Sequence, residues 1–427
     1  MNEDDSEQIA TLLTQMGYSP TDNVEDADII MLNTCSVRAK PEQKVRSKLG
    51  ELRELKAQKP DIIIGVCGCM AQKEGLAIRR RAPHVDLVVG TANISRIPEM
   101  ICQVNQRRHP LSALDLPRKV SDDALLPGRT TSNTPGIKAF LPIMYGCDNF
   151  CAYCVVPHVR GKERSRPLLD IVSEAADMIA QGCKEITLLG QNVNSYGQTL
   201  EEPVSFAALL RELNGIGVER IRFMTSHPKD LSSELINAMA ELEHVCEHIH
   251  LPVQSGDDEV LQGMRRGYTI EKYREKLARL REAVPDISVT TDFIVGFPGE
   301  TEQQFENTLK VVQDLRFDAA FMFAYNLIPN TAAAKMQGQV GTAEKNARLG
   351  RLIELQNAIS VEKNISEVGR EFEVLVEGSS PKGDGKLTGL TRQNKTVNFS
   401  CDRDIKGQLV RVRAVRGHLW GFSGDLV

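Results

Sequence analysis

Residues 146–154 read GCDNFCAYC and place Cys147, Cys151 and Cys154 in one short segment, with spacings of four and three residues. The segment directly follows the apolar run 140–144, which predicts a buried strand. Three thiolates on such a loop can each bind one iron of a [4Fe–4S] cluster, which leaves the fourth iron open for a ligand. A structural zinc ion would need a fourth protein ligand, and His158 is the candidate for that alternative. We favour the iron–sulfur interpretation.

The sequence after this segment alternates between short apolar runs and amphipathic helical patterns. The predicted strands are residues 140–144, 186–189, 220–224, 248–251, 288–294 and 319–325. A closed barrel of eight strand–helix units usually needs about 250 residues, whereas these units fill only about 190. We therefore expect an open, partial (β/α)6 barrel, which ends with a long helix over residues 342–363.

Two further regions flank this core, which we place at residues 133–363. Residues 1–106 alternate helix and strand patterns and predict an α/β domain with a parallel sheet covered on both faces. Residues 107–132 are rich in proline, serine and threonine and are interpreted as a linker. Residues 366–427 contain alternating strands separated by glycines, which is typical of a small antiparallel β-barrel. The predicted fold class is therefore α/β with a C-terminal β-barrel.

Composition excludes several classes of protein. With 41% hydrophobic and 26% charged residues, the 427-residue chain is not largely disordered. Its formal charge of −5 means that any contact with nucleic acid depends on a local basic surface. The longest nearly apolar run, residues 62–71, is about half the roughly 20 residues of a membrane span, and the acidic start MNEDDSEQ is unlike a secretory signal. We expect a soluble, cytoplasmic protein whose clustered cysteines, six of the ten, serve metal or redox chemistry rather than disulfides.

The triplet spacing, with Tyr153 before the third cysteine, resembles the radical S-adenosylmethionine (SAM) superfamily. Further segments are similar, over essentially the whole chain, to its methylthiotransferase family: NTCSVR (33–38), GCMAQ (68–72), VVPHVRGKERSRP (155–167), LLGQNVNSYG (188–197), HLPVQSG (250–256) and TDFIVGFPGET (291–301). The SVR after Cys35 and the PVQ after Leu251 are most similar to the branch that acts on N6-dimethylallyladenosine 3′ to a tRNA anticodon. The resemblance implies a transferase that inserts sulfur and a methyl group at C2 of that adenosine. One SAM molecule would donate the methyl group and another would yield a 5′-deoxyadenosyl radical at the Cys147/Cys151/Cys154 cluster.

Polar residues and a glycine at the predicted strand ends are candidates for the SAM pocket. Active sites of such barrels lie at the carboxyl ends of the strands, where Gln191 and Asn192 follow residues 186–189. The alternative is that these two amides only cap the next turn. The expected cofactor-binding set is completed by Tyr153, Ser226, Gln254, Asp292 and Gly296, the glycine allowing backbone to approach the adenine closely.

The resemblance also implies an auxiliary [4Fe–4S] cluster on three cysteines of the N-terminal domain. Cys35 and Cys69 match two of the three ligands. The third belongs to a Gly-Cys-Gln-Met-Asn stretch, and we expect the native chain to start upstream of Met1 and to carry it. Cys67 has no counterpart in the family pattern and is interpreted as a buried thiol. Residues 326–330, NLIPN, lack an arginine and a glycine that the family tends to have there.

Residues 386–416 contain eight basic and two acidic residues, and they resemble the TRAM RNA-binding module. The candidate RNA contacts are Arg392, Lys395, Arg411 and Arg413, with Phe399 as a base-stacking ring; the alternative is a solvated charged face. A second basic run, Arg160, Lys162, Arg164 and Arg166, could steer an anticodon loop or pair with acidic neighbours.

The expected partners are the tRNA anticodon stem-loop and an electron donor such as a flavodoxin or ferredoxin. Two other functions remain open at this point. One is the same chemistry on another tRNA nucleoside or on a ribosomal protein. The other is a non-catalytic iron–sulfur protein that binds RNA, because one auxiliary ligand is missing.

Overall fold

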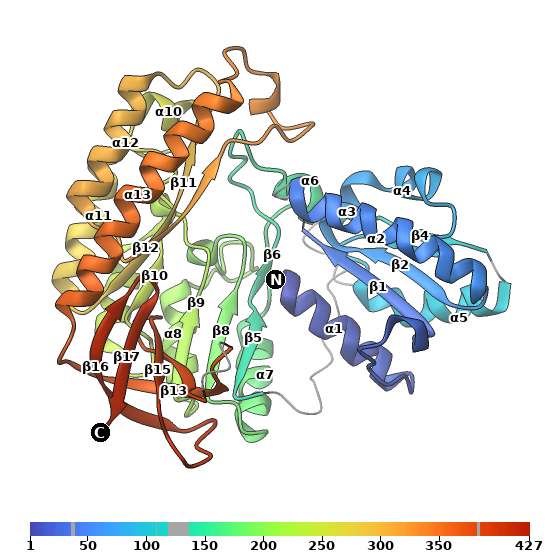
Figure 1. The fold of residues 1–427 in the computed structure, drawn as a ribbon, viewed down its shortest axis with the longest axis horizontal. Coiled ribbons are helices and arrows are strands. Elements are labelled where there is room, and N and C mark those ends of the chain that lie inside the picture. The colour runs from blue at the N-terminus through green and yellow to red at the C-terminus, as the bar shows by residue number, and fades with distance from the viewer. Residues whose placement is uncertain (36–38, 108, 118–135, 382–384) are drawn as a thin grey trace.

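The computed structural model describes residues 1–35, 39–107, 109–117, 136–381 and 385–427. They form three regions in chain order (Figure 1): an N-terminal α/β domain, a central set of parallel strands with outer helices, and a C-terminal β-barrel. This arrangement confirms the predicted fold class. Among the described helices, none is both long and apolar enough to span a lipid bilayer.

The N-terminal domain is built on a parallel sheet in the order β1 (Ile29–Thr34), β2 (Ile63–Cys67), β3 (Leu87–Val89) and β4 (Leu111–Ala113). One face packs against α1 (Asn2–Gln15) and α5 (Ile97–Arg107), and the other against α2 (Ala39–Gln58), α3 (Gly68–Glu74) and α4 (Leu76–Arg81). Strand β4 falls inside the predicted linker, so that expectation is wrong for residues 111–113. Its three residues are too short for a periodic pattern, and pairing with β3 makes them a strand.

The core contains six parallel strands in two hydrogen-bonded sheets. The first is β5 (Lys138–Pro142), β8 (Glu185–Leu189) and β9 (Arg220–Phe223); the second is β10 (His248–His250), β11 (Ser288–Val295) and β12 (Ala319–Ala324). A parallel bridge between Ile221 and Val245 joins β9 to the start of the second sheet. The outer helices are α7 (Leu168–Ala180), α8 (Phe206–Asn214), α9 (Ser233–Glu241), α10 (Asp258–Gly263), α11 (Ile270–Ala283), α12 (Glu302–Leu315) and α13 (Thr342–Ser366).

The predicted strand 140–144 is divided into two parts. After β5, the short strand β6 (Met144–Tyr145) leaves the parallel sheet and pairs antiparallel with β7 (Arg164–Ser165). The chain then turns at Gly146, where φ is +73° and an added Cβ would lie 1.9 Å from the Lys162 carbonyl oxygen. Only glycine fits this turn, which leads directly into the cysteine loop.

The C-terminal region is a closed barrel of β13 (Glu371–Ser379), β14 (Leu387–Thr391), β15 (Thr396–Phe399), β17 (Gly421–Leu426) and β16 (Leu409–His418), in that spatial order. Its pairs are antiparallel as expected, except that β15 and β17 run parallel. The barrel packs on the amino-terminal ends of the core strands (Figure 1), where Arg220 and Arg222 of β9 donate hydrogen bonds to the carbonyl oxygens of Leu390 and Thr391.

Candidate active site

The cysteine loop runs from Cys147, after β6, to Cys154, just before the short helix α6 (Val156–Arg160). The backbone N–H of Cys147 donates to the Gly161 carbonyl, and that of Cys154 donates to the Cys151 carbonyl at 2.9 Å. A third bond, from Ala152 N–H to the Met264 carbonyl, ties the loop to the core. Phe150 has φ of +47°, a conformation that a non-glycine residue adopts at an energetic cost. The loop is therefore held in one shape by a bond within the triplet and by bonds to Gly161 and Met264.

Each of the three sulfur atoms accepts a hydrogen bond. The Asn149 amide donates to Cys147 Sγ, the Val156 N–H to Cys154 Sγ and the Arg266 guanidinium to Cys151 Sγ, each at 3.4 Å. Burial raises the pKa of Cys147 to about 11 and that of Cys154 to about 12, so these groups are neutral thiols at pH 7. Iron would supply the positive charge that deprotonates them, since a coordinating thiol loses its proton. The donor set therefore fits a cluster.

The zinc alternative has no support. Within the parts of the chain that the structure describes, no three His, Cys, Asp or Glu side chains converge on a point that could hold one metal ion. Thiolates that bind separate irons of a cubane lie farther apart than the ligands of a single ion, so this result is compatible with a cluster.

Arg266 is a site residue that the sequence did not reveal. It is buried, and besides Cys151 its guanidinium donates to the Pro252 carbonyl at 2.9 Å and to the Tyr268 hydroxyl. The Arg266 guanidinium thus places a positive charge beside the Cys151 sulfur. The only signal was the pair Arg265–Arg266 after a helical pattern, which is not specific.

Two of the expected SAM-pocket residues carry buried polar atoms that remain unsatisfied. Ser226 Oγ and Gln254 Oε1 have no hydrogen-bond partner among the described residues. Both lie beyond the carboxyl ends of core strands, and Gln254 has φ of +73°, as Thr225 next to Ser226 has φ of +70°. Buried groups without partners and strained backbone mark sites that bind a ligand. The position of these two atoms fits a polar cofactor.

Other predicted pocket residues have different surroundings. Asn192 is fully used inside the protein: its amide donates to Ser195 and Asp230, and its oxygen accepts from the His227 N–H. None of these bonds caps the backbone of the short helix that follows, and the role of Asn192 as a cofactor contact stays a prediction. Gly296 has φ of +71°, and the Lys345 side chain fills the space that a Cβ would occupy, with Cγ 2.2 Å from that position; the approach of the Gly296 backbone to an adenine stays a prediction.

Tyr153 lies within the cysteine loop and Gln191 follows β8, and both side chains contact other parts of the protein. The Gln191 amide nitrogen is 2.9 Å from Met1 Sδ. Tyr153 packs in the cluster of Ala152, Val260 and Phe297. Their role as cofactor contacts stays a prediction.

Asp292 lies on the inner face of the core strands, together with two residues that the sequence did not reveal. Its carboxylate is 3.3 Å from His250 Nε2, and the His250 ring makes an edge contact with Phe321, with centroids 5.9 Å apart. Phe321 pairs in register with Asp292, and 50% of its surface is exposed. The alternation along β11 and β12 could have indicated this inward aromatic ring.

The structure brings Cys35 and Cys69 together at the carboxyl edge of the N-terminal sheet. Cys35 follows β1, Cys69 lies in the first turn of α3 after β2, and their thiols are hydrogen-bonded to each other. This bond and burial raise the pKa of Cys69. Cys67 is fully buried in the domain core, as expected. No third metal-binding side chain joins the pair within the described ranges.

Helix α6 connects the two cysteine sites. It begins two residues after Cys154, and its Val155–Val159 side packs against Cys69, as does Ile328 of the altered 326–330 loop. Arg160 at its end contacts Cys69 and forms a buried ion pair with Asp5 of α1 at 2.6 Å. Figure 1 shows α6 beside α3, between the N-terminal domain and the core. Two residues of the second basic run thus pair internally, since Arg166 likewise binds Glu174, whereas Lys162 is exposed.

Two of the four candidate RNA contacts are internal. Arg392 binds Glu247 and the Val245 carbonyl, and Lys395 is buried 3.3 Å from Asp318. Both hold the C-terminal barrel on the core, so their assignment to RNA is wrong. Phe399 is also buried in the barrel core and cannot stack on a base.

The other two candidate RNA contacts lie at the surface. Arg413 pairs with Glu371, whereas Arg411 is 73% exposed and lies 4.0 Å from the same carboxylate. The exposed aromatic residue of this barrel is Trp420, in the turn between β16 and β17, with 63% of its surface accessible. The available basic surface of the barrel is thus smaller than the charge count suggests.

A thiol triplet at the carboxyl ends of parallel strands, with an aromatic residue before its last cysteine, defines a radical SAM protein. The Radical SAM superfamily model matches residues 141–312, the uncharacterized family UPF0004 matches 1–90, and the TRAM domain matches 366–427. Superfamily membership implies a [4Fe–4S] cluster and SAM.

A similar fold occurs in the radical SAM methyltransferase TsrM from Kitasatospora setae, with a TM-score of 0.58, 15% identity, and coverage of 77% of this chain and 70% of that one. A second similar structure is the cobalamin-dependent radical enzyme OxsB, with a TM-score of 0.51, 14% identity, and coverage of 82% and 52%. At these identities the likeness concerns the fold alone.

Two relatives are similar over the full length of the chain. The tRNA-2-methylthio-N(6)-dimethylallyladenosine synthases of Alkaliphilus oremlandii and Moorella thermoacetica are 49% and 48% identical to it, covering 100% of this chain and 90% and 96% of theirs. The chain belongs to the tRNA-2-methylthio-N(6)-dimethylallyladenosine synthase family of radical SAM methylthiotransferases.

Proposed function

We propose that the protein is a tRNA methylthiotransferase that adds sulfur and a methyl group at C2 of N6-dimethylallyladenosine on the 3′ side of the anticodon. The observation that carries this proposal is the pairing of two cysteine sites across α6: the triplet of hydrogen-bonded sulfurs on one side, and Cys35 with Cys69 on the other. One site suits radical formation and the other suits holding sulfur.

When bound, the clusters and SAM supply an open iron, a 5′-deoxyadenosyl radical and a methyl group. The protein's own residues position these groups. Arg266 holds Cys151 and places a positive charge beside its sulfur. Ser226 and Gln254 offer unsatisfied oxygen atoms at the strand ends, where they can hydrogen-bond a polar cofactor. Gln191, Tyr153 and Asp292 complete the proposed pocket.

The inner face beside Asp292 is where we place the substrate adenine. His250 is fixed by Thr290, whose hydroxyl is 3.0 Å from its Nδ1, and by the Asp292 carboxylate. Phe321 presents an exposed ring next to this pair, and a flipped base can stack on such a ring. The apolar dimethylallyl group gives the same ring a second contact.

Electrons for the radical cluster must come from another protein, for which a flavodoxin or ferredoxin is the proposed class. On the C-terminal barrel, Arg411 and Arg413 are the proposed RNA contacts that remain. For the auxiliary cluster, Cys35 and Cys69 are the proposed ligands supplied by the described residues, together with a third cysteine.

The test is anoxic reconstitution followed by assay. The wild-type protein should bind iron and sulfide, form 5′-deoxyadenosine when reduced with SAM, and convert prenylated anticodon stem-loop RNA to the methylthio product. Cys151→Ala should abolish 5′-deoxyadenosine, whereas Cys401→Ala, remote from both sites, should not. About eight irons per chain support transfer; about four irons with RNA binding but no product would favour the non-catalytic alternative.

Cells that lack the protein provide the substrate test. Nucleoside mass spectrometry should show loss of the methylthio mark and accumulation of prenylated adenosine. If another nucleoside or a ribosomal protein loses its methylthio group instead, the substrate assignment is wrong while the reaction class stands.

A further inference from the structure

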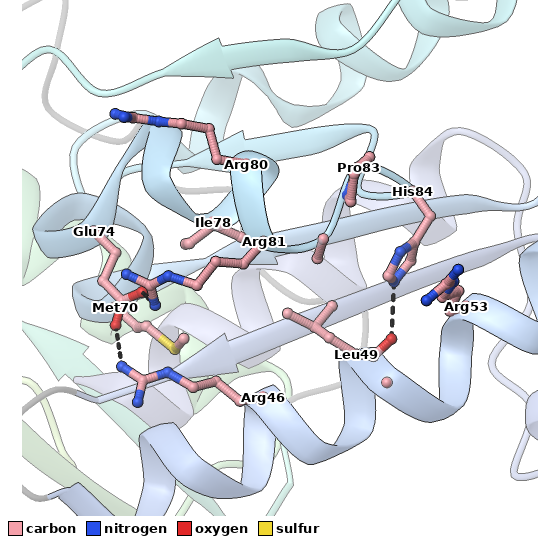
Figure 2. Close-up of a pocket in the computed structure, with 12 residues that line it drawn as sticks. Arg46, Leu49, Arg53, Met70, Glu74, Ile78, Arg80, Arg81, Pro83 and His84 are labelled. Atoms are coloured by element: carbon pink, nitrogen blue, oxygen red, sulfur yellow. Dashed lines mark hydrogen bonds and ion pairs between the residues drawn. The ribbon is translucent and has the colours of Figure 1, made fainter.

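The N-terminal domain contains a pocket of about 610 Å3 between α2 and α4, on the face of the sheet opposite α1 and α5. Its apolar lining includes Leu49, Met70 and Ile78 (Figure 2). Its charged lining consists of four arginines and one glutamate: Arg46, Arg53, Arg80, Arg81 and Glu74. The pocket therefore carries an excess of three positive charges (four minus one) in a chain whose net charge is −5.

The acidic groups near this pocket are already occupied. Glu74 accepts from Arg46 at 2.5 Å and from Arg81 at 2.8 Å, and Figure 2 shows both guanidinium groups converging on it at one end. Glu42, 3.6 Å from Arg46, is also bound by Lys73. Arg53 lies at the other end, near His84. Neither Arg53 nor Arg80 has an acidic partner within the described residues, and both are exposed.

Glu74 is shared by two of the four arginines, whereas Arg53 and Arg80 have no acidic partner in the described part of the chain. The pocket therefore keeps positive charge that a bound anion would offset. The planar guanidinium group matches the oxygen geometry of a phosphate and can bind it with two parallel hydrogen bonds. The shared chemistry is therefore that of a phosphate-bearing ligand.

We propose that this pocket, which we call the arginine pocket, binds backbone phosphates of the RNA substrate. The inference rests on the proposed function for the identity of the RNA. It is favoured over a free nucleotide because the two unpaired arginines lie at the exposed rim, where a long polyanion can reach both. It also adds to the positive charge of the C-terminal barrel, where Arg392 and Lys395 are used internally.

The arginine pocket also lies close to the auxiliary cysteines. Helix α3 carries Cys69 in its first turn and Glu74 at its last residue, a separation of about 8 Å along the helix axis. Met70, next to Cys69, is part of the pocket lining. RNA bound in this pocket would therefore lie one short helix away from the cysteines that we assign to sulfur transfer.

The test compares the double variant Arg53→Ala/Arg80→Ala with Lys44→Ala, which removes an exposed cation of α2 that does not line the pocket. Affinity for a prenylated anticodon-arm RNA is measured on the cluster-bearing protein over a series of salt concentrations. The double variant should bind about tenfold more weakly and lower the salt slope by about two, one for each lost phosphate contact. Lys44→Ala should match the wild type.

Two further measurements separate the sources of the anion. Thermal shifts with inorganic phosphate and with AMP test for a free ligand. If these stabilise the wild type but not the variant while RNA affinity is unchanged, the pocket serves a free phosphate and the RNA proposal is wrong. Polyglutamate serves as a probe for an acidic protein partner. If the double variant loses only the binding of polyglutamate, the RNA proposal is also wrong.

Failure of the proposed function gives a different result. In that case the wild type itself does not bind the prenylated RNA in preference to the unprenylated RNA, or forms no 5′-deoxyadenosine. Loss of affinity for both RNAs in the double variant would still support the pocket. The variant should form 5′-deoxyadenosine without RNA as the wild type does, which excludes a folding defect.

Discussion

Replacing Arg160 by methionine should loosen the N-terminal domain from the core. Arg160 and Asp5 form an ion pair at 2.6 Å with side chains only 7% and 6% exposed, and the two residues belong to α6 and α1. Arg160→Met keeps much of the side-chain volume but leaves the Asp5 carboxylate buried without its partner. Breaking a buried pair in this way costs about 3–5 kcal/mol.

Hydrogen exchange measured by mass spectrometry is the suitable assay, because a chain with three regions does not unfold in two states. Peptides from α1 and α3 should exchange faster by roughly two to four orders of magnitude, since each 1.4 kcal/mol corresponds to about a factor of ten. Arg166→Met is the matched control. It breaks the Arg166–Glu174 pair inside the core and should leave α1 unchanged.

The double variant Arg160→Met/Asp5→Asn removes both charges and should recover much of the lost protection. The reasoning is refuted if α1 exchanges at the wild-type rate in Arg160→Met. It is also refuted if the double variant is destabilised by the sum of the two single changes, because the two residues would then act independently.

Three further outcomes are expected. Arg392→Ala should increase proteolysis between the core and the C-terminal barrel, because it breaks the ion pair with Glu247. Arg411→Ala should weaken RNA binding about threefold to tenfold and leave proteolysis unchanged. If both variants changed both assays equally, the assignment of Arg392 to the domain interface and of Arg411 to RNA would be wrong. Phe321→Ala should raise KM for prenylated RNA at least several-fold and reduce the preference over unprenylated RNA, with little change in stability because the ring is half exposed; an unchanged preference would exclude a substrate contact. Burial lowers the pKa of His248 to about 3, so its ring stays neutral in the folded state. In the unfolded state the ring takes up a proton below about pH 6.5. The free energy of unfolding therefore decreases as the pH falls from 6.5 towards 3. The stability advantage of the wild type over His248→Gln, measured by urea unfolding of cluster-free protein, should therefore shrink by at most about 1.4 kcal/mol per pH unit in that window, and a constant difference would contradict the assignment.

The cysteine loop could be predicted from the sequence because its information is local. Cys147, Cys151 and Cys154 lie within eight residues, and a preceding apolar run is enough to place them at a strand end. The meeting of Cys35 with Cys69 followed from the same rule, since parallel strands present their carboxyl ends at one edge of a sheet.

Residues whose partners lie far along the chain were assigned less well. Arg392 and Lys395 have the same local pattern as Arg411, but Glu247 and Asp318 are distant core residues that only the tertiary fold brings to them. The Asn192 amide donates a hydrogen bond to Asp230 and accepts one from the His227 N–H. The residues around Asn192 in the sequence do not indicate either partner. Charge and amide content identify a candidate, while the contacts across domains decide its role.

The length of helix α6 determines how the two cysteine sites face each other. Its five residues span about 8 Å, with the radical site at its beginning and Cys69 against its side. Val155 and Val159 lie one turn apart on the side that packs against Cys69, so a residue inserted between them would rotate Val159 by about 100° away from that contact. A surface loop that makes no such contact can change in length without this effect. The length of α6 is constrained, because a longer α6 would lose the packing of Val159 against Cys69 and change how the two cysteine sites face each other.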